Sequence, residues 1–314
     1  MGGPAPAVTR PRAVAGAALV AVVTCLTAWA LAYPAAPLGA TVVRAVALGA
    51  AVTTLGLAVV PALDTGRYRA ELRRRAAAPL VVAAAVWLVA ELARVLTSTA
   101  SAAGTPVLTV GWHTAADFLA TTSAGRAALL TIAAAALVVA LAVLAPVPGP
   151  AGAVVAGAAA VGLVGHSVSG HLAGDPVGSV AVAGHTLAAA LWCGALAALS
   201  LTVEHRGQWS RVLPRFSQLS LWCVIALLAA GVTAAAIQLP SAGALFSTGY
   251  GRVLTLKVVC TAVLLTLAWR HRSVWVPAAR GHRSTAALSR RRAVLELAVM
   301  AVALAAAATL AVTG

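Results

Sequence analysis

The chain has 314 residues, of which 61% are hydrophobic and only 9% are charged, and its formal net charge is +15. Its apolar runs are too long for the helices or strands of a soluble core and are typical of membrane-spanning helices. In a soluble protein the basic excess would suggest nucleic acid binding. Here it marks the orientation of the chain in a lipid bilayer, so no nucleic-acid partner is predicted.

Apolar segments of about 20 residues, the length that crosses a hydrocarbon core of about 30 Å, recur along the chain. We predict an all-α polytopic transmembrane helical bundle of about nine helices, or about eight if the short, Gly/Ala-rich fifth segment does not form. Helices are expected because open sheet edges cannot satisfy their backbone groups in hydrocarbon. The predicted segments are 13–33, 39–61, 79–98, 125–145, 150–166, 179–201, 216–239, 251–270 and 293–312.

Basic residues gather in four parts of the sequence between these segments. They are 10–12, 67–75, 206–215 and 270–292. All four fall on one side if the N-terminus lies in the cytoplasm, as the positive-inside rule requires, and the C-terminus then lies outside. The outer connections, nearly free of Lys and Arg, are 34–38, 99–124, 167–178 and 240–250.

The start of the chain has two interpretations. Arg10 and Arg12 before an apolar run fit a cleaved signal peptide, but this run exceeds the usual apolar length of about 7 to 15 residues. We therefore expect an uncleaved first helix. The chain is divided into an N-terminal four-helix membrane region, 1–150, and a second membrane domain, 151–314.

Charged residues inside a bilayer are costly, so each is a candidate functional residue. Glu91 is expected to neutralise Arg44 or Lys257 across a helix interface, because a paired charge is far cheaper to bury than a lone one. The alternative is that such pairs only lock the packing of helices. The charged residues mapped to the membrane are Arg44, Glu91, Arg94, Arg252 and Lys257 in outer halves, and Glu296 near the inner end of the last helix.

Histidines are concentrated in one stretch near the outer face. His166 and His171 are five residues apart and flank small residues, a spacing that suits a turn closing over an ion, and Asp175 adds a carboxylate. His185 lies about a turn and a half into the sixth helix, within reach of the same mouth if the loop folds back. These three imidazoles predict a metal site.

His113 and Asp117 are spaced i, i+4 in another outer segment, hence on one face if that segment is helical. A lone histidine near an interface is more often a packing residue, which is the favoured interpretation for His113 by itself. Imidazole and carboxylate suit Cu(II) or Zn(II), whereas thiolate and thioether suit Cu(I). Met1 and Met300 are the only methionines, so a methionine ladder for Cu(I) is excluded.

The remaining candidates are sulfur ligands and inner histidines. Cysteines fall only inside predicted helices and form no CxxC pair, so neither a disulfide framework nor a zinc finger is predicted. Cys193, eight residues after His185, lies about two turns deeper on roughly the same helix face. It is a candidate second, softer ligand on a metal path, although such a cysteine is more often a core residue. His205, His271 and His282 lie among arginines and are expected on a solvated basic surface.

The C-terminal third resembles a known family. The runs FSQLSLWCVIALLAAGVTAAAIQL, STGYGRVLTLKVVCTAVLLTLAWRHR and LSRRRAVLELAVM, preceded by GHTLAAALWCGAL, resemble the copper resistance D (CopD) family of bacterial inner-membrane proteins. The resemblance extends from about residue 180 to 312. The first 150 residues resemble it less distinctly, most of all in WLVAELARVL around Glu91.

This resemblance implies copper transport across the bacterial cytoplasmic membrane, often with a small copper-binding partner of the CopC type. It makes His185 the intramembrane metal ligand and Tyr250, Arg252, Lys257 and Glu296 a polar framework. The chain carries no CopC-like β domain, so we expect any such partner to be separate. Cys193 departs from the small or apolar residue expected after Trp192.

The hypothesis that follows is copper import. Copper would be captured by outer-face histidines, passed to His185, and, after reduction to Cu(I) by an outside donor, moved to Cys193. One alternative is a non-transporting copper-binding assembly or sensor protein. Another, less favoured, is a haem-binding electron carrier, which needs about four axial ligands where only His185 lies clearly inside. No activated serine or cysteine constellation is visible, so no enzyme is predicted.

Overall fold

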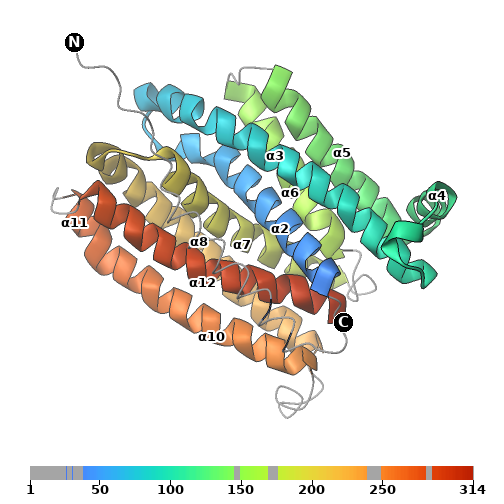
Figure 1. Ribbon diagram of the computed structural model, residues 1–314. Helices are drawn as coiled ribbons and strands as arrows, with labels where there is room; N and C mark the ends of the chain where they lie inside the picture. The colour runs from blue at the N-terminus through green and yellow to red at the C-terminus, as the bar shows by residue number, and fades with distance from the viewer. Residues whose placement is uncertain are drawn as a thin grey trace.

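The computed structural model describes residues 38–144, 149–168, 176–238, 249–280 and 285–313, together with Leu26 and Ala30. Every regular element within these ranges is helical (Figure 1), which confirms the all-α membrane bundle. The elements are α2 (Leu38–Val59), η1 (Val60–Leu63), α3 (Gly66–Ala103), η2 (Val107–Thr109), α4 (Trp112–Thr121), α5 (Ser123–Leu144), α6 (Gly149–Val168), α7 (Pro176–Thr202), α8 (Arg206–Gln238), α10 (Gly249–Arg270), η3 (His271–Trp275), α11 (Val276–Arg280) and α12 (Ala286–Thr313).

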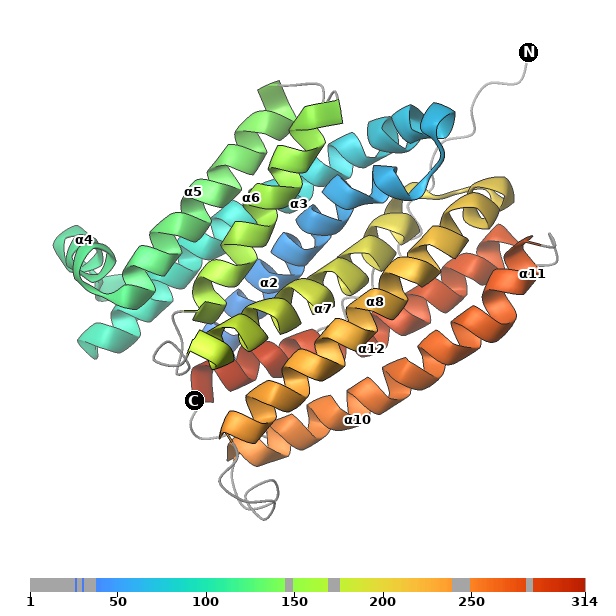
Figure 2. The same ribbon diagram turned by 180° about the vertical axis from the view of Figure 1, so that it is seen from behind.

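Each predicted apolar segment from the second to the ninth coincides with a long helix, while the first, 13–33, lies almost wholly outside the described residues. The short fifth segment is present as α6. In the described part of the chain, six helices are long and apolar enough to cross a membrane. α6, with its apolar stretch Ala151–Gly165, and α12 run alongside them (Figures 1 and 2).

The helices extend further than the apolar segments alone indicate. α3 begins at Gly66 rather than near residue 79, and α8 begins at Arg206 rather than near residue 216. Arg, Ala, Leu and Gln are strong helix formers, so the helix continues past the hydrocarbon into the basic flanking sequence. The inner arginines therefore stand on helical turns.

α2 is the central helix of the bundle. It packs against α3 and α6 on one side and against α7 and α12 on the other. α5 completes the first group by packing on α3 and α6, and α8 and α10 complete the second by packing on α7 and α12 respectively (Figures 1 and 2).

The two groups approach most closely where α2 crosses α7. A Cβ added to Gly56 would lie 1.8 Å from the carbonyl oxygen of Gly194, and one added to Gly194 would lie 2.2 Å from the carbonyl oxygen of Val52. Neither position has room for a side chain. Small residues allow this backbone contact, as expected for helices that associate in lipid without a hydrophobic driving force.

The arginine-rich connections meet at one end of the bundle, which we name the inner end because of the positive-inside rule. The buried carboxylate of Asp64 accepts hydrogen bonds from Arg211 at 3.0 and 3.2 Å, and Arg215 donates to the Asp64 carbonyl at 2.6 Å. Arg75 pairs with Glu204 at 2.9 Å. These contacts tie η1, α3 and α8 together, and Arg290 donates a hydrogen bond to the carbonyl oxygen of Val203 at 3.2 Å, so three of the four predicted basic clusters lie on the same side.

The opposite end, which we name the outer end, holds the turn from α3 to α5. α3 ends at Gly104, whose φ of 63° closes the helix in the left-handed region that glycine adopts readily. α4 follows and packs on α3 and α5 (Figure 1). The end of α6 and the start of α7 lie at this same end, which places His185 nearer to it than Cys193.

Candidate functional site

His185 projects from α7 against α8. Its ring Nδ1 lies 3.2 Å from the carbonyl oxygen of Leu227, and the side chain is half-buried. Gly231, one turn further along α8, leaves room for the ring, because a Cβ at that position would lie 3.2 Å from Nδ1. When Nδ1 donates to the carbonyl, Nε2 carries the free lone pair, which is the arrangement that second-shell contacts impose on metal-binding histidines.

Two cysteines lie deeper along the same helix pair. Cys193 of α7 and Cys223 of α8 are both buried and both free thiols. The two thiols are close enough to interact electrostatically, and the carboxylate of Glu296 on α12 interacts with Cys193 in the same way. Sulfur from two helices therefore faces one level of the bundle, about two turns below His185.

Glu296 and His271 form a buried pair nearer the inner end. Glu296 Oε2 lies 3.4 Å from His271 Nδ1, and the two residues are 4% and 6% exposed. Glu296 Oε1 and His271 Nε2 have no hydrogen-bond partner among the described residues. Phe216 and Trp275 stack near the imidazole, with ring centroids 5.5 and 4.1 Å away. Each of these two buried groups therefore has one polar atom without a partner among the described residues.

A cleft of about 260 Å³ opens beside this pair, between α10, η3 and α12. Its polar lining consists of His271, Glu296, Arg270 and Arg292. Arg292 Nη1 is buried and, within the described part of the chain, has no hydrogen-bond partner either. η3 is a π-helical turn, a rare feature that often occurs at functional sites. The cleft connects the buried pair to the basic inner end.

The position of His271 corrects the prediction of a solvated inner histidine. The residue follows Arg270 in the sequence and begins the π turn, but its side chain is buried against Glu296 and Trp275. Its spacing of four residues from Trp275 could have indicated that it is buried, because this spacing places both residues on one helix face. His205 is exposed, as expected, and His282 lies outside the described residues.

The charges of the first helix group pair with one another. Glu91, 3% exposed, lies 3.5 Å from Arg94 and accepts a hydrogen bond from Trp87 Nε1 at 3.4 Å. Arg44 of α2 is a further electrostatic neighbour of Glu91. Of the two partners predicted for Glu91, Arg44 is close enough to interact with it electrostatically, whereas Lys257 of α10 interacts with His185.

The predicted outer-face ligands either lie away from His185 or have side chains outside the described part of the chain. His113 and Asp117 are exposed on α4, which packs on α3 and α5 at the edge of the bundle away from α8 and α10 (Figures 1 and 2). His166 lies in α6, and Tyr250 and Arg252 lie in α10, but their side chains are outside the described part. His171 and Asp175 fall wholly outside it.

No three His, Cys, Asp or Glu side chains converge into a metal-binding group within the described ranges. What the structure does bring together is a series of His, Cys and Glu side chains between α7, α8, α10 and α12. They are His185, then Cys193 with Cys223, then Glu296 with His271. Such an arrangement suits an ion that is passed between ligands better than one that is held permanently.

Two family models match this chain. Copper resistance protein D matches residues 210–310, which include α10, α12 and the Glu296–His271 pair. Copper resistance protein D-like, N-terminal domain, matches residues 33–179, which include α2 to α6 and extend the resemblance to the first helix group. No curated protein and no solved structure matches the chain. The two matches span most of the sequence in the family's order, and the chain belongs to the copper resistance protein D family of membrane proteins.

Proposed function

We propose that this multi-pass membrane protein imports copper across the bacterial cytoplasmic membrane, with the ion passing between α7, α8, α10 and α12. The observation that carries the proposal is the succession of His185, Cys193 with Cys223, and Glu296 with His271 from the outer toward the inner end, between α7, α8, α10 and α12. Membership in a copper resistance family supplies the identity of the ion.

The ligand types change with depth in a way that suits reduced copper. The imidazole of His185 can bind copper as Cu(I) or Cu(II), whereas the thiols of Cys193 and Cys223 favour Cu(I). We therefore propose that copper moves inward from His185 as Cu(I), which forms when an electron donor on the outer side reduces Cu(II). The two cysteines give the proposed path its soft ligands.

Charge favours the same direction. Lys257 is the electrostatic neighbour of His185 and repels a cation held there, while Glu296 is the neighbour of Cys193 and attracts one. Interactions between charges are stronger in the low-dielectric interior than in water. A copper ion at His185 is therefore drawn toward the level of Cys193, which is inward.

Capture at the outer end is the part of the proposal that rests on sequence. His166, His171 and Asp175 lie between the apolar stretches of α6 and α7 in the chain, at the end from which His185 is nearest. We propose that they take copper from a separate CopC-like protein outside the membrane. His113, on the distant α4, is the least suited of the predicted ligands to share this mouth.

The test is copper uptake into proteoliposomes, with Cu(I) and Cu(II) supplied separately. The native chain is compared with a His166→Ala, His171→Ala, His185→Ala variant whose fold is checked by circular dichroism. We expect saturable uptake, faster with Cu(I), that the triple variant loses. Stoichiometric copper binding without uptake by the native chain would contradict transport and assign the protein to copper sensing or assembly.

A further inference from the structure

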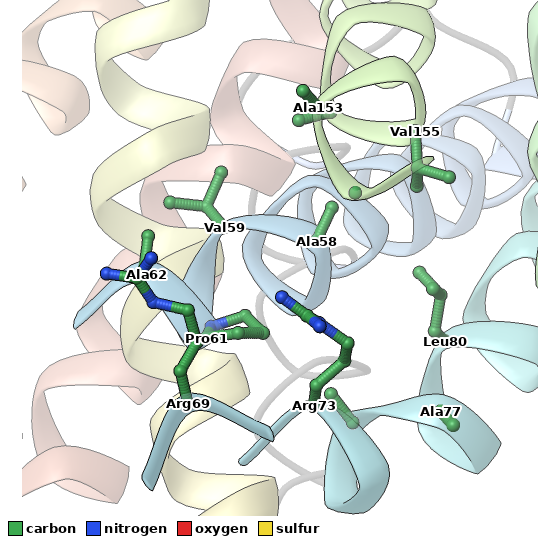
Figure 3. Close-up of a pocket in the computed structure, with 13 residues that line it drawn as sticks. Ala58, Val59, Pro61, Ala62, Arg69, Arg73, Ala77, Leu80, Ala153 and Val155 are labelled. Carbon is green, nitrogen blue, oxygen red and sulfur yellow. The ribbon is translucent and has the colours of Figure 1, made fainter. Parts of the chain in front are cut away.

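A second hollow lies in the first helix group, far along the sequence from the copper path. It is a groove of about 320 Å³ at the inner end, with α2 and η1 as its floor and α3 and α6 as its walls (Figure 3). α3 and α6 touch deeper in the membrane, where a Cβ on Gly162 would lie 2.6 Å from the ring of Trp87. The two helices diverge from that contact toward the inner end, and the groove is the opening between them.

The walls of the groove are apolar and small. The side chains that leave it open include Ala77 of α3 and Ala153 of α6, both exposed, and the floor is formed by Ala58 and Val59. In a membrane protein such a surface faces lipid chains. Larger side chains at the same places would fill it.

Arg69 and Arg73 stand at the mouth of this groove (Figure 3). Within the described ranges neither guanidinium has an ion-pair or hydrogen-bond partner, although acidic side chains are close by in the sequence. Glu71 between them pairs instead with Arg74 and Arg75. Two uncompensated positive charges therefore lie over an apolar groove.

We propose that this groove binds one anionic phospholipid of the inner leaflet, with its phosphate on Arg69 and Arg73 and an acyl chain between α3 and α6. Basic pockets between transmembrane helices on the cytoplasmic side recognise acidic lipid headgroups, and that leaflet carries the negative surface potential. Arginine suits the phosphate because its planar fork of donors matches the phosphate oxygens.

The dimensions agree with this occupant. From Arg73 to Leu80, the deepest residue of α3 in the lining, the helix rises about 10 Å, the depth of the upper part of an acyl chain below its headgroup. A free phosphate would use the arginines but not the apolar walls. A second protein copy would need complementary acidic residues at the mouth, whereas the lipid brings its own charge.

The charge requirement is tested by native mass spectrometry of the full-length protein released from micelles containing phosphatidylglycerol or phosphatidylcholine. We expect one retained phosphatidylglycerol and no retained phosphatidylcholine. Arg69→Gln with Arg73→Gln is expected to weaken retention about ten-fold or more. The matched control, Arg67→Gln with Arg74→Gln, removes the same charge from exposed positions on the same helix and is expected to retain the lipid.

The shape requirement is tested by Ala77→Leu with Ala153→Leu, which fills the groove without changing charge. This variant is expected to lose the lipid as well, with an unchanged circular dichroism spectrum. Equal retention of both lipids, equal loss in the control pair, or retention in the filled variant would each overturn the proposal. So would a native dimer that the filled variant abolishes, because the groove would then be a subunit interface. None of these readouts depends on copper transport.

Discussion

Glu91 and Glu296 are both buried carboxylates, 3% and 4% exposed, but their surroundings differ. Glu91 has Arg94 at 3.5 Å, Trp87 Nε1 at 3.4 Å and Arg44 as a further electrostatic neighbour. Glu296 contacts His271 at 3.4 Å, and its second oxygen has no hydrogen-bond partner among the described residues.

We interpret this difference as one between a structural charge and a functional one. In the first helix group the charge of Glu91 is satisfied by fixed protein partners, so it locks α2 against α3. In the second group the buried polar atoms retain capacity for a ligand, which is costly for stability and is the pattern of intramembrane residues on ion paths. Four predictions test whether the two helix groups differ in this way.

The largest effect is expected for Glu91→Gln. Removing this carboxylate takes the negative charge away from the partly buried Arg44 and Arg94, which destabilises the fold by about 3 kcal/mol. Copper uptake per folded molecule is expected to stay at the native level. The measurement combines unfolding in detergent with uptake by the folded fraction. A stable variant that fails to transport would place Glu91 on the copper path and remove the contrast.

Glu296→Gln is expected to do the opposite. The amide keeps the shape of the side chain and a contact to His271, so stability changes by about 1 kcal/mol or less. Copper uptake is expected to fall about ten-fold, because the negative charge near Cys193 and the orientation of His271 are both lost. Unchanged uptake, measured at equal protein content and orientation, would show that this carboxylate is only structural.

The next effect concerns the thiols. Cys193→Ser is expected to slow Cu(I) uptake several-fold and to leave copper binding at His185 in place, because a hydroxyl is a poor ligand for a soft ion. Cys260→Ser is the matched control, since Cys260 is also buried and free but is not among the groups that interact electrostatically with Cys193. Equal slowing in both variants would mean that the loss is one of packing and would remove Cys193 from the path.

The smallest effect is expected for Gly231→Ala. The added Cβ would lie 3.2 Å from His185 Nδ1, so the ring must move by a few tenths of an ångström, and copper affinity should fall about two- to five-fold. Gly49→Ala, where nothing lies within 4 Å, is the control and should stabilise its helix slightly. Copper titration by isothermal calorimetry measures both. Equal affinity in the two variants would show that α8 does not position His185.

The sequence was sufficient for the fold because segment length and arginine placement are direct consequences of the bilayer. Eight apolar segments became helices, and the three arginine clusters in the described part share one end. The helix ends were less predictable, since Arg and Ala extend α3 and α8 without any change in hydrophobicity.

Candidate site residues could be recognised from the sequence only where a single polar or sulfur-containing residue interrupts an apolar segment. His185, Cys193 and Glu296 stand out for that reason, although their role remains a prediction. His271 did not, because arginines surround it in the sequence, although its side chain is buried against Glu296 and Trp275. The separation of His113 from His185 was equally hidden, since it depends on α4 packing against α3 and α5 rather than near α7.

The most direct measurement is Cu(I) uptake by proteoliposomes containing His185→Ala or His113→Ala, with the native chain alongside. Both variants remove one imidazole from the outer half of the protein, but only His185 lies between α7 and α8. We expect His185→Ala to abolish saturable uptake and His113→Ala to keep the native rate. Equal rates in the two variants, whether lost or retained, would contradict a copper path between α7, α8, α10 and α12.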